Sequence, residues 1–475
     1  MKYDYDILVI GLGPAGMAVS IMGSEMGLKV CAVEKHKIGG ECMNVGCIPS
    51  KSLLRMAKAR SLYDKLGRLG LSAAEKPAVV DPFPRIDAHL DFIREKKTMK
   101  MFDKVDLVYQ QGHASFIDRH TVEVAGKKYS ARRIYICTGT SAAVPDFPGI
   151  GEIDYLTNET MFALESVPES MIITGGGAIA CEMAQAFARL GSEVTMIIRG
   201  PRLMWRQSSD ATDIVEKSLE ADGVRILREQ KPTRFSPSAD KPGYSVMETD
   251  DSERIESEKV LVAAGRKMMF ESMNLDAAGV KHDSKGIKVN RFLQTSRRNI
   301  YACGDCNGFA QFSHAAMHQG MLAIMNSMMH RPMKQNYRSE KYAVPWTVFT
   351  DPQFSHVGLA ERELVERGIK YETITANYGD YGAAIAEAVD VGHVKVFASK
   401  MGKIYGVDII GEGSGEMINE WTLAMQQKIR LHKIMLTQHS FPTMGFLSKR
   451  IAEMWMMKRM KSKAIRSLCK LMFRF

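Results

Sequence analysis

Two segments of the 475-residue sequence share one design, and that design restricts the fold more than any other feature. Each runs from a short apolar strand through a glycine-rich turn and an apolar helix to a second strand, over residues 5–34 and again over residues 170–199. The turns read GLGPAG at 11–16 and GGGAIA at 175–180. One such turn is weak evidence because glycine is common. Two copies in the same strand–turn–helix–strand context predict two Rossmann-like dinucleotide-binding domains.

The first glycine-rich turn predicts a binding site for a dinucleotide pyrophosphate. Gly11 allows a tight turn, Gly13 lets the backbone approach the phosphates, and Gly16 allows close packing of helix on strand. The N-terminus of the helix then faces the phosphates. Glu34, at the end of the second strand, is placed to accept hydrogen bonds from ribose hydroxyls. The alternative is a turn-forming glycine cluster followed by a surface glutamate.

The second turn repeats this pattern, but the residues after its second strand differ in charge. The turn residues are Gly175, Gly177 and Ala180. A site selective for NAD carries a carboxylate at the end of that strand, whereas this sequence carries Arg199 there, with Arg202 and Arg206 following. A guanidinium matches phosphate geometry, so NADPH is favoured over NADH. The alternative is that these arginines only cap a solvated loop.

A third glycine-rich segment, GGECMNVGCIPSK at 39–51, places two cysteines five positions apart where the chain turns into a helix. Thiols held over a bound flavin make a redox relay. A thiolate at a helix N-terminus is stabilised, so its pKa falls and it is a usable nucleophile at neutral pH. We therefore predict that Cys42 and Cys47 form a redox-active pair. A purely structural disulfide is the alternative.

Together these motifs resemble the flavoprotein pyridine nucleotide–disulfide oxidoreductases, the family of dihydrolipoyl dehydrogenase, glutathione reductase and mercuric reductase. The resemblance covers roughly residues 4–446 and also rests on AAGR at 263–266, ACGD at 302–305 and VPWTVFTDPQFSHVG at 344–358. It implies an α/β fold with two Rossmann-like domains, for FAD and NAD(P), and a C-terminal α+β dimerisation domain. The implied boundaries are 1–150 and 266–335 for the FAD domain, 151–265 for the NAD(P)H domain, 340–456 for the dimerisation domain and 457–475 for a basic tail.

The resemblance also implies roles for individual residues. Cys42 would be the interchange thiol that meets the substrate, and Cys47 the charge-transfer thiol near the flavin. Lys51 would point toward the flavin N5 edge and pair with Glu182, which is also implied as an NAD(P) contact together with Gly265. The further implied FAD contacts are Gly40, Ala114, Thr138, Gly139, Gly304, Asp305 (at the ribityl chain) and Ala315. No metal ligand is implied.

The segment QHSFPTMGF at 438–446 departs from the family pattern. Disulfide reductases of the family carry His-Pro-Thr with a glutamate three residues after the threonine, and that histidine, supplied by the other subunit, moves the proton in thiol exchange. Here Phe441 stands in place of the histidine and Phe446 in place of the glutamate, and neither carries a proton. His439 is a candidate substitute. Two aromatic rings would make an apolar access channel, so we expect an atypical electron acceptor.

Three kinds of acceptor stay open for a homodimeric FAD enzyme of this type. They are a small-molecule or protein disulfide, a metal ion, and a quinone that takes electrons from the flavin. Mercuric reductases also lack the histidine, but they normally add a cysteine pair near the C-terminus, where this sequence has only Cys469. A redox-sensing flavoprotein without catalytic activity is the alternative outside the enzymes, and the intact thiol relay argues against it.

Positive charge is concentrated at the C-terminus. The net charge is +10, and the last 29 residues carry nine basic side chains against one acidic, so the body is nearly neutral and no nucleic-acid partner is expected. Apolar residues recur at three- and four-residue steps between Met457 and Phe475, which predicts a basic amphipathic helix on an anionic membrane surface. Packing on the dimer partner is the alternative.

Neither a signal peptide nor a transmembrane helix is expected, and we expect a cytoplasmic enzyme that lies at the inner face of the membrane. The remaining cysteines fall within apolar strands and helices or in the turn that follows a strand. We expect the following to be core residues: Cys31, Cys137, Cys181, Cys303 and Cys306.

Overall fold

The computed structural model describes residues 2–338 and 342–474, and the chain divides into two compact units. Among these residues, unit 1 comprises 2–56, 79–175 and 232–338, and unit 2 comprises 57–78, 176–231 and 342–474. The division falls within the second glycine-rich turn, between Gly175 and Gly176. The predicted domain boundaries, of which residue 340 lies outside the described residues, stay predictions.

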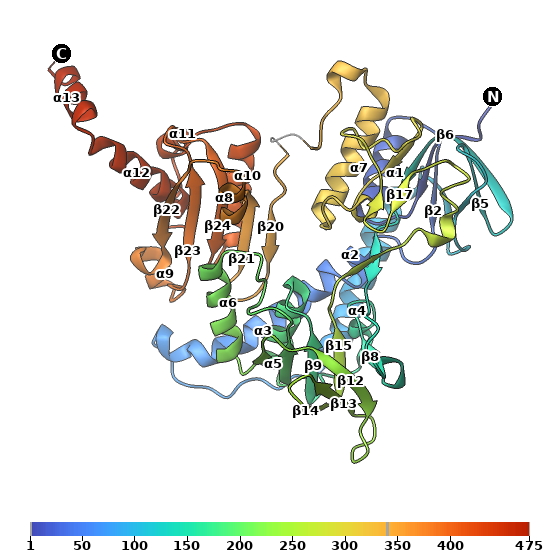
Figure 1. The fold of residues 1–475 in the computed structure, drawn as a ribbon, viewed down its shortest axis with the longest axis horizontal. Helices are drawn as coiled ribbons and strands as arrows, with labels where there is room; N and C mark the ends of the chain where they lie inside the picture. Colours follow the sequence, from blue (N-terminus) through green and yellow to red (C-terminus); the bar gives the residue numbers. More distant parts are fainter. Residues whose placement is uncertain (1, 339–341, 475) are drawn as a thin grey trace. The chain divides into compact units, whose positions relative to one another are not determined.

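A largely parallel sheet forms the centre of unit 1, with the strand order β3-β2-β1-β6-β5-β4 and with β19 beside β6 (Figure 1). Its strands are β1 (Tyr5–Ile10), β2 (Val30–Glu34), β3 (Asp106–Tyr109), β4 (Ser115–Phe116), β5 (Thr121–Val124), β6 (Lys127–Ile136) and β19 (Ile300–Ala302). β1, β2, β3, β6 and β19 pair in parallel, and β4 and β5 are antiparallel additions. Leu8 and Ile134 are fully buried in its core. Helices α1 (Pro14–Glu25) and α7 (Ser313–Met328) pack against each other.

Smaller sheets and helices complete unit 1. The further sheet strands are β7 (Thr140–Ala142) paired with β16 (Arg266–Met268), β8 (Tyr155–Leu156) and β9 (Ser170–Thr174) beside β15 (Lys259–Val262), β12 (Pro232–Pro237) with β13 (Ser245–Thr249) and β14 (Arg254–Ser257), and β17 (His282–Asp283) with β18 (Gly286–Ile287). The further helices are α2 (Gly40–Asn44), α3 (Cys47–Ser61), which runs on into unit 2, and α4 (Pro82–Ile93). A 3-10 helix over Leu62–Leu69 and an irregular segment lie between α3 and α4 in the sequence.

Unit 2 contains the helix and strand that follow the second glycine-rich turn. These elements are α5 (Ala178–Leu190), β10 (Glu193–Ile197), α6 (Ser209–Ala221) and β11 (Arg225–Leu227), and β10 pairs in parallel with β11. The first glycine-rich helix, α1, and the second, α5, both begin directly after a glycine, Gly13 and Gly177. Both predicted strand–turn–helix–strand segments are present, as the sequence indicates.

The C-terminal part of unit 2 is an antiparallel sheet covered by helices. Its order is β20 (Trp346–Val348), β21 (Phe354–Gly358), β24 (Ile404–Ile410), β23 (His393–Ala398) and β22 (Glu372–Asn377). The helices are α8 (Glu361–Glu366), α9 (Gly382–Ala386), α10 (Ser414–Gln426), α11 (Leu431–Leu436) and α12 (Phe446–Met460). Trp421 of α10 and Ile451 of α12 are fully buried against the sheet.

Asp351 connects several segments of unit 2. Its carboxylate accepts a hydrogen bond from Arg189 Nη1 at 2.9 Å and from Lys65 Nζ at 3.1 Å, and Lys58 Nζ lies 3.9 Å away. Burial opposes ionisation, but the three cations hold the pKa of Asp351 below its usual value. The network therefore fixes the segment 57–78 to α5 and to the loop before β21.

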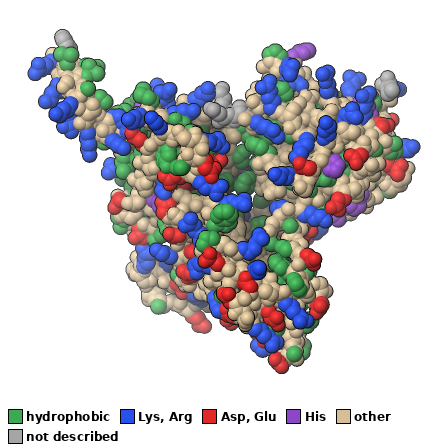
Figure 2. Space-filling view, in the orientation of Figure 1, with side chains coloured by type: hydrophobic (Ala, Val, Ile, Leu, Met, Phe, Trp, Pro, Cys, Tyr) green, Lys and Arg blue, Asp and Glu red, His purple; other side chains and the backbone are tan. Residues whose placement is uncertain are grey.

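The predicted basic tail consists of two helical pieces. α12 ends at Met460, and α13 (Lys463–Met472) follows after a break at Lys461 and Ser462. Phe475 lies outside the described residues. α13 buries none of its residues, and Figure 2 shows Lys and Arg side chains gathered on this end of unit 2. No helix in residues 2–338 or 342–474 is long and apolar enough to cross a membrane.

Candidate functional site

The first glycine-rich turn and the cysteine segment meet backbone to backbone. A Cβ on Gly40, whose φ is +57°, would lie 2.8 Å from the Cα of Gly13. In the turn itself, a Cβ on Gly11 would lie 2.6 Å from the carbonyl oxygen of Cys137, and one on Gly16 would overlap the carbonyl of Gly11. A side chain at Gly11, Gly16 or Gly40 would clash with backbone atoms, so these glycines allow the close backbone packing that a pyrophosphate-binding turn requires.

Polar groups around this turn fit a bound FAD. Glu34 is buried, and its two carboxylate oxygens each accept one backbone hydrogen bond, from Leu12 N at 2.7 Å and from His36 N at 2.8 Å. Each oxygen keeps a second lone pair for a ribose hydroxyl. The hydroxyl of Thr138 is buried without a hydrogen-bond partner among the described residues. An unsatisfied buried hydroxyl costs free energy, so it favours a ligand that bonds to it.

Cys42 lies in α2 and Cys47 is the first residue of α3, and the two are not joined by a disulfide. Cys47 Sγ lies 3.2 Å from the hydroxyl of Ser313, the first residue of α7. A hydrogen bond to Cys47 and then burial raise the pKa of the Cys42 thiol well above its usual value, while Ser313 and the charge of Lys51 lower it. In the reduced pair, Cys42 therefore keeps its proton.

A charged network lies directly before Cys42, and sequence reasoning missed it. Arg266 Nη2 forms a short hydrogen bond to the carboxylate of Glu41, and Arg266 Nε donates to Thr140 Oγ1 at 3.0 Å. Thr140 donates in turn to Asp305 at 3.1 Å. Burial raises the pKa of Asp305 and raises that of Glu41 to about 7, although Arg266 opposes the shift in both; the neighbouring Glu159 raises the pKa of Glu41 further. The AAGR and GGEC motifs contain Arg266 and Glu41, so the signal was present in the sequence.

The remaining residues implied as FAD contacts all belong to unit 1. Ala114 and Ala315 are buried, and Gly139 and Gly304 both have positive φ, 68° and 83°. Gly304 N donates to Gln319 Oε1 at 2.9 Å, which fixes the turn after β19. The five cysteines expected in the core are buried, which confirms that prediction.

The residues implied as NAD(P) contacts belong to both units. A Cβ on Gly175 would lie 2.4 Å from the carbonyl oxygen of Ala263, whereas the space around Gly177 is open. Ala180 is buried in the first turn of α5. Gly265 has a φ of +142°, and its carbonyl accepts a hydrogen bond from the Ala143 N–H at 3.0 Å.

Glu182 and Lys51 belong to different units, and their ion pair stays a prediction. Within unit 2 the buried carboxylate of Glu182 accepts a hydrogen bond from the Phe349 N–H at 2.9 Å. Arg199 is exposed directly after β10, and Arg206 stacks on the ring of Trp205 at 5.1 Å.

The segment 438–446 brings three aromatic rings together. Phe446 stacks on Tyr381 with ring centroids 6.1 Å apart, and Phe441 packs edge-on against Phe446 at 5.3 Å while its side chain stays 70% exposed. His439 does not join these rings; its Nε2 lies 2.9 Å from the carboxylate of Glu420. Tyr381 comes from a different part of unit 2, so the sequence pattern of this segment could not indicate it.

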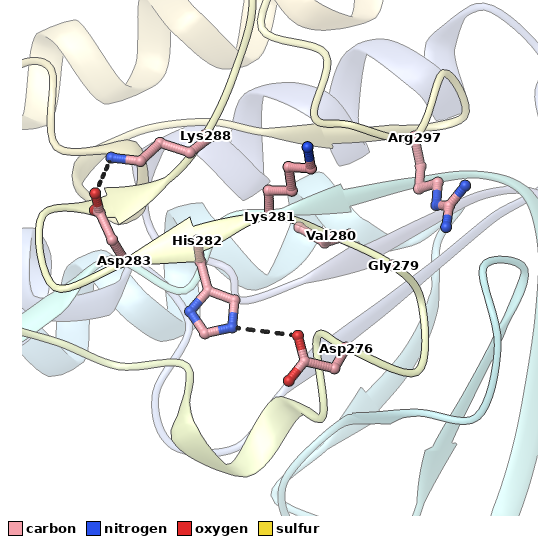
Figure 3. Close-up of a pocket in the computed structure, with 8 residues that line it drawn as sticks. All are labelled: Asp276, Gly279, Val280, Lys281, His282, Asp283, Lys288 and Arg297. Carbon is pink, nitrogen blue, oxygen red and sulfur yellow. Dashed lines mark ion pairs between the residues drawn. The ribbon is translucent and has the colours of Figure 1, made fainter.

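A separate pocket of about 610 Å³ in unit 1 contains no predicted site residue. Four of its side chains form two pairs, with Lys288 donating to Asp283 at 2.5 Å and His282 Nε2 lying 3.8 Å from Asp276 (Figure 3). No group of three or more His, Cys, Asp or Glu side chains that could hold a metal ion occurs within the described part of the chain.

The site combines two glycine-rich dinucleotide turns with a thiol pair at the start of a helix. These features define an oxidoreductase that binds two dinucleotides and uses a dithiol. More specifically, the chain belongs to the pyridine nucleotide-disulphide oxidoreductase family, whose sequence profile matches residues 5–320, and the dimerisation domain of that family matches residues 344–449. It is an FAD-dependent enzyme of this family. The family resemblance and the fold class predicted from the sequence are confirmed.

Relatives within the family include enzymes with different acceptors. A mercuric reductase of Staphylococcus aureus is 32% identical over 89% of this chain and 77% of its own length. A dihydrolipoyl dehydrogenase of Thermus scotoductus is 32% identical over 93% of this chain and 95% of its own length. Among solved structures, the HOCl-induced flavoprotein disulfide reductase RclA from Escherichia coli matches with a TM-score of 0.83 at 24% identity, covering 95% of this chain and 99% of that chain, and shows the shared fold.

Proposed function

We propose that this chain is a homodimeric, NADPH-preferring reductase that passes electrons through Cys42 and Cys47 to an acceptor that needs no proton shuttle, with a soft metal ion such as Hg(II) favoured. The observation that carries the proposal is the combination of a complete thiol pair with the aromatic residues Phe441 and Phe446 in the shuttle positions. The mercuric reductase relatives add support. Bound FAD would supply hydride acceptance from NADPH and transfer of the electron pair to the disulfide.

The protein residues manage charge and protons around that transfer. Two electrons and one proton convert the disulfide into the Cys42 thiol and the Cys47 thiolate, and Ser313 contacts the thiolate. Thiolates are the ligands that soft metal ions prefer. Hg(II) would exchange its thiolate ligands for the sulfurs of this pair, and two electrons reduce it to Hg(0).

An acceptor panel tests this proposal. NADPH oxidation by the FAD-loaded enzyme is measured with Hg(II) in excess thiol, lipoamide, glutathione disulfide and quinones, using the wild type, Cys42→Ser and Cys469→Ser. We expect Hg(II)-dependent oxidation that is lost in Cys42→Ser and kept in Cys469→Ser, because Cys469 is a single exposed thiol on α13. Faster turnover with lipoamide or glutathione disulfide than with Hg(II) contradicts the proposal, and quinone reduction that survives Cys42→Ser supports direct electron transfer from the flavin.

The His439–Glu420 pair favours disulfide reduction as a second candidate function. A histidine held by a carboxylate at 2.9 Å is a suitable proton carrier. If it serves thiol exchange, His439→Gln lowers disulfide reduction about 100-fold or more and leaves reduction of the enzyme by NADPH unchanged. Equal loss of both steps indicates a structural role instead.

We also propose that Arg199 and Arg206 select NADPH by binding its 2′-phosphate. Both belong to the loop after β10, where an NAD-selective site carries a carboxylate. The double variant Arg199→Gln/Arg206→Gln should raise the KM for NADPH with little change for NADH. Arg234→Gln, an exposed arginine on β12, is the matched control. An unchanged ratio of the two KM values refutes this selectivity.

We further propose that α13 binds anionic membrane surfaces and places the enzyme at the inner face of the membrane. Its exposed apolar residues Leu468 and Leu471 alternate with Lys and Arg, and all described residues of the helix are outside the core (Figure 2). A chain ending at Met460 should lose co-sedimentation with anionic vesicles, and neither chain should bind zwitterionic ones. Equal binding of both chains to anionic vesicles refutes the proposal.

A further inference from the structure

The loop from Arg199 to Gln207 in unit 2 is held against the second glycine-rich turn. Met204 N donates to the Gly176 carbonyl at 2.9 Å, and Leu203, which is fully buried, anchors the loop beside it. Met204 has a φ of +44°, in the left-handed region that non-glycine residues rarely adopt. Because Leu203 points inward and Met204 reverses the chain, the next residue, Trp205, emerges at the surface.

Trp205 is unusual because a large aromatic side chain stays 49% exposed without joining a core. Its ring covers Gly200, where a Cβ would lie 3.1 Å from the ring. The guanidinium of Arg206 lies over the ring at 5.1 Å from its centroid. In the same loop, Nε of Arg202 is buried without a hydrogen-bond partner among the described residues. The loop thus presents one guanidinium over an aromatic face and one donor without a hydrogen-bond partner among the described residues.

We infer that Trp205 is a specificity-determining residue. Its ring holds the Arg206 guanidinium in the position where it can bind the 2′-phosphate of a nucleotide. The inference deepens the proposed NADPH selectivity and rests on it. A free arginine side chain loses rotamer freedom when it binds a phosphate, and stacking on an indole ring removes part of that freedom beforehand. Trp is the aromatic side chain that binds a cation best. Trp205 contributes through Arg206 and is therefore a positioning residue.

The role predicts a selective effect on phosphate recognition. Without Trp205, Arg206 still carries its charge but must be ordered by the ligand. Affinity for 2′,5′-ADP should fall, whereas affinity for 5′-AMP, which lacks the 2′-phosphate, should stay the same. Adenine stacking on Trp205 would instead lower both affinities together, so the two ligands separate the two roles.

The experiment measures Kd values for 2′,5′-ADP and 5′-AMP by calorimetry on FAD-loaded protein. Trp205→Leu should raise the Kd for 2′,5′-ADP by about 3- to 10-fold and change the Kd for 5′-AMP less than 2-fold. Trp205→Phe should restore most of the difference, because a phenyl face also binds a cation. Quenching of tryptophan fluorescence by 2′,5′-ADP should be lost in Trp205→Leu. Trp205→Gln replaces the leucine variant if that variant does not retain FAD.

The outcomes distinguish this inference from the proposed function. If Arg206→Gln abolishes discrimination between the two nucleotides while Trp205→Leu leaves it intact, the inference is wrong and NADPH selectivity stands. If both affinities fall equally in Trp205→Leu, positioning of Arg206 is also refuted. If neither Arg199→Gln nor Arg206→Gln changes discrimination, the proposed selectivity itself is wrong, and the inference fails with it.

Discussion

Replacing Glu41 with glutamine tests the electrostatics directly beside the redox thiols. Glu41 precedes Cys42, its side chain is 27% exposed, and it pairs with Arg266. The ion pair favours the carboxylate, but burial acts in the opposite direction and Glu159 adds repulsion. Burial is the largest effect, so the pKa of Glu41 rises from 4.5 to about 7. The holoenzyme should therefore contain a neutral or half-neutral carboxyl at physiological pH.

The sign and size of the effect follow from proton linkage. The folded state binds more protons than the unfolded state between pH 4.5 and about 7, so stability falls as the pH rises through this window. This pKa shift corresponds to a loss of about 3 kcal/mol in the free energy of unfolding at most. The loss is complete above the pKa of the folded state and absent below the pKa of the unfolded state. Glu41→Gln does not titrate, so it should gain stability relative to the wild type as the pH rises from 5 to about 8.

Two measurements check this reasoning. Difference infrared spectra of the FAD-loaded enzyme should show a carboxylic acid band that titrates near pH 7 and disappears in Glu41→Gln. Melting temperatures of both proteins across the same pH range should converge at low pH and separate at high pH in favour of the variant. If Glu41→Gln removes no carboxylic acid band, or if the two melting curves shift in parallel, Glu41 is ionised beside Arg266 and burial does not raise its pKa as expected.

Three further substitutions test the glycine-rich FAD turn, the redox thiols and the Asp351 network of unit 2. Gly40→Ala should speed the release of FAD, because the added Cβ would lie 2.8 Å from the Cα of Gly13. Gly27→Ala is the control, since Gly27 also has a positive φ but has open space around it. Equal rates of FAD release from the two variants would contradict the importance of this close packing. In the reduced enzyme, Cys47→Ser should abolish thiolate absorbance near neutral pH and Cys42→Ser should keep it; the reverse would reassign the thiolate. Asp351→Asn should cost about 3–5 kcal/mol of stability above pH 4, since Arg189 is buried. The loss should shrink as the pH falls through the lowered pKa of Asp351. Breaking the exposed pair of Asp390 and Arg68 should cost much less stability, and similar losses for both would count against the network.

The sequence was most informative where the chemistry lies within one short segment. The glycines of GLGPAG and GGGAIA and the cysteines of GGECMNVGCIPSK carry their conformational and redox requirements locally, so the fold class and the family could be predicted. Contacts between distant positions could not. Ser313 lies 266 residues after Cys47, and Arg266 lies 225 residues after Glu41, so only the folded chain brings each pair together. The helical tail was predicted as one piece, whereas the break at Ser462 reflects backbone geometry that periodicity does not encode.

The proton on Cys42 connects the proposed choice of acceptor with the phenylalanines of the segment 438–446. Attack on a disulfide forms one S–S bond while it breaks another, so a thiolate leaves in the same step and needs a proton donor nearby. Phe441 cannot be that donor, so a disulfide acceptor would depend on His439, which is paired with Glu420. A soft metal ion can add a further thiolate before it releases one, because its coordination number is not fixed at two. The displaced ligand could then take the proton of Cys42 itself. Under the proposed function, the pair Cys42–Cys47 would therefore be sufficient for a thiolate-bound metal ion, whereas a disulfide would need a further proton donor.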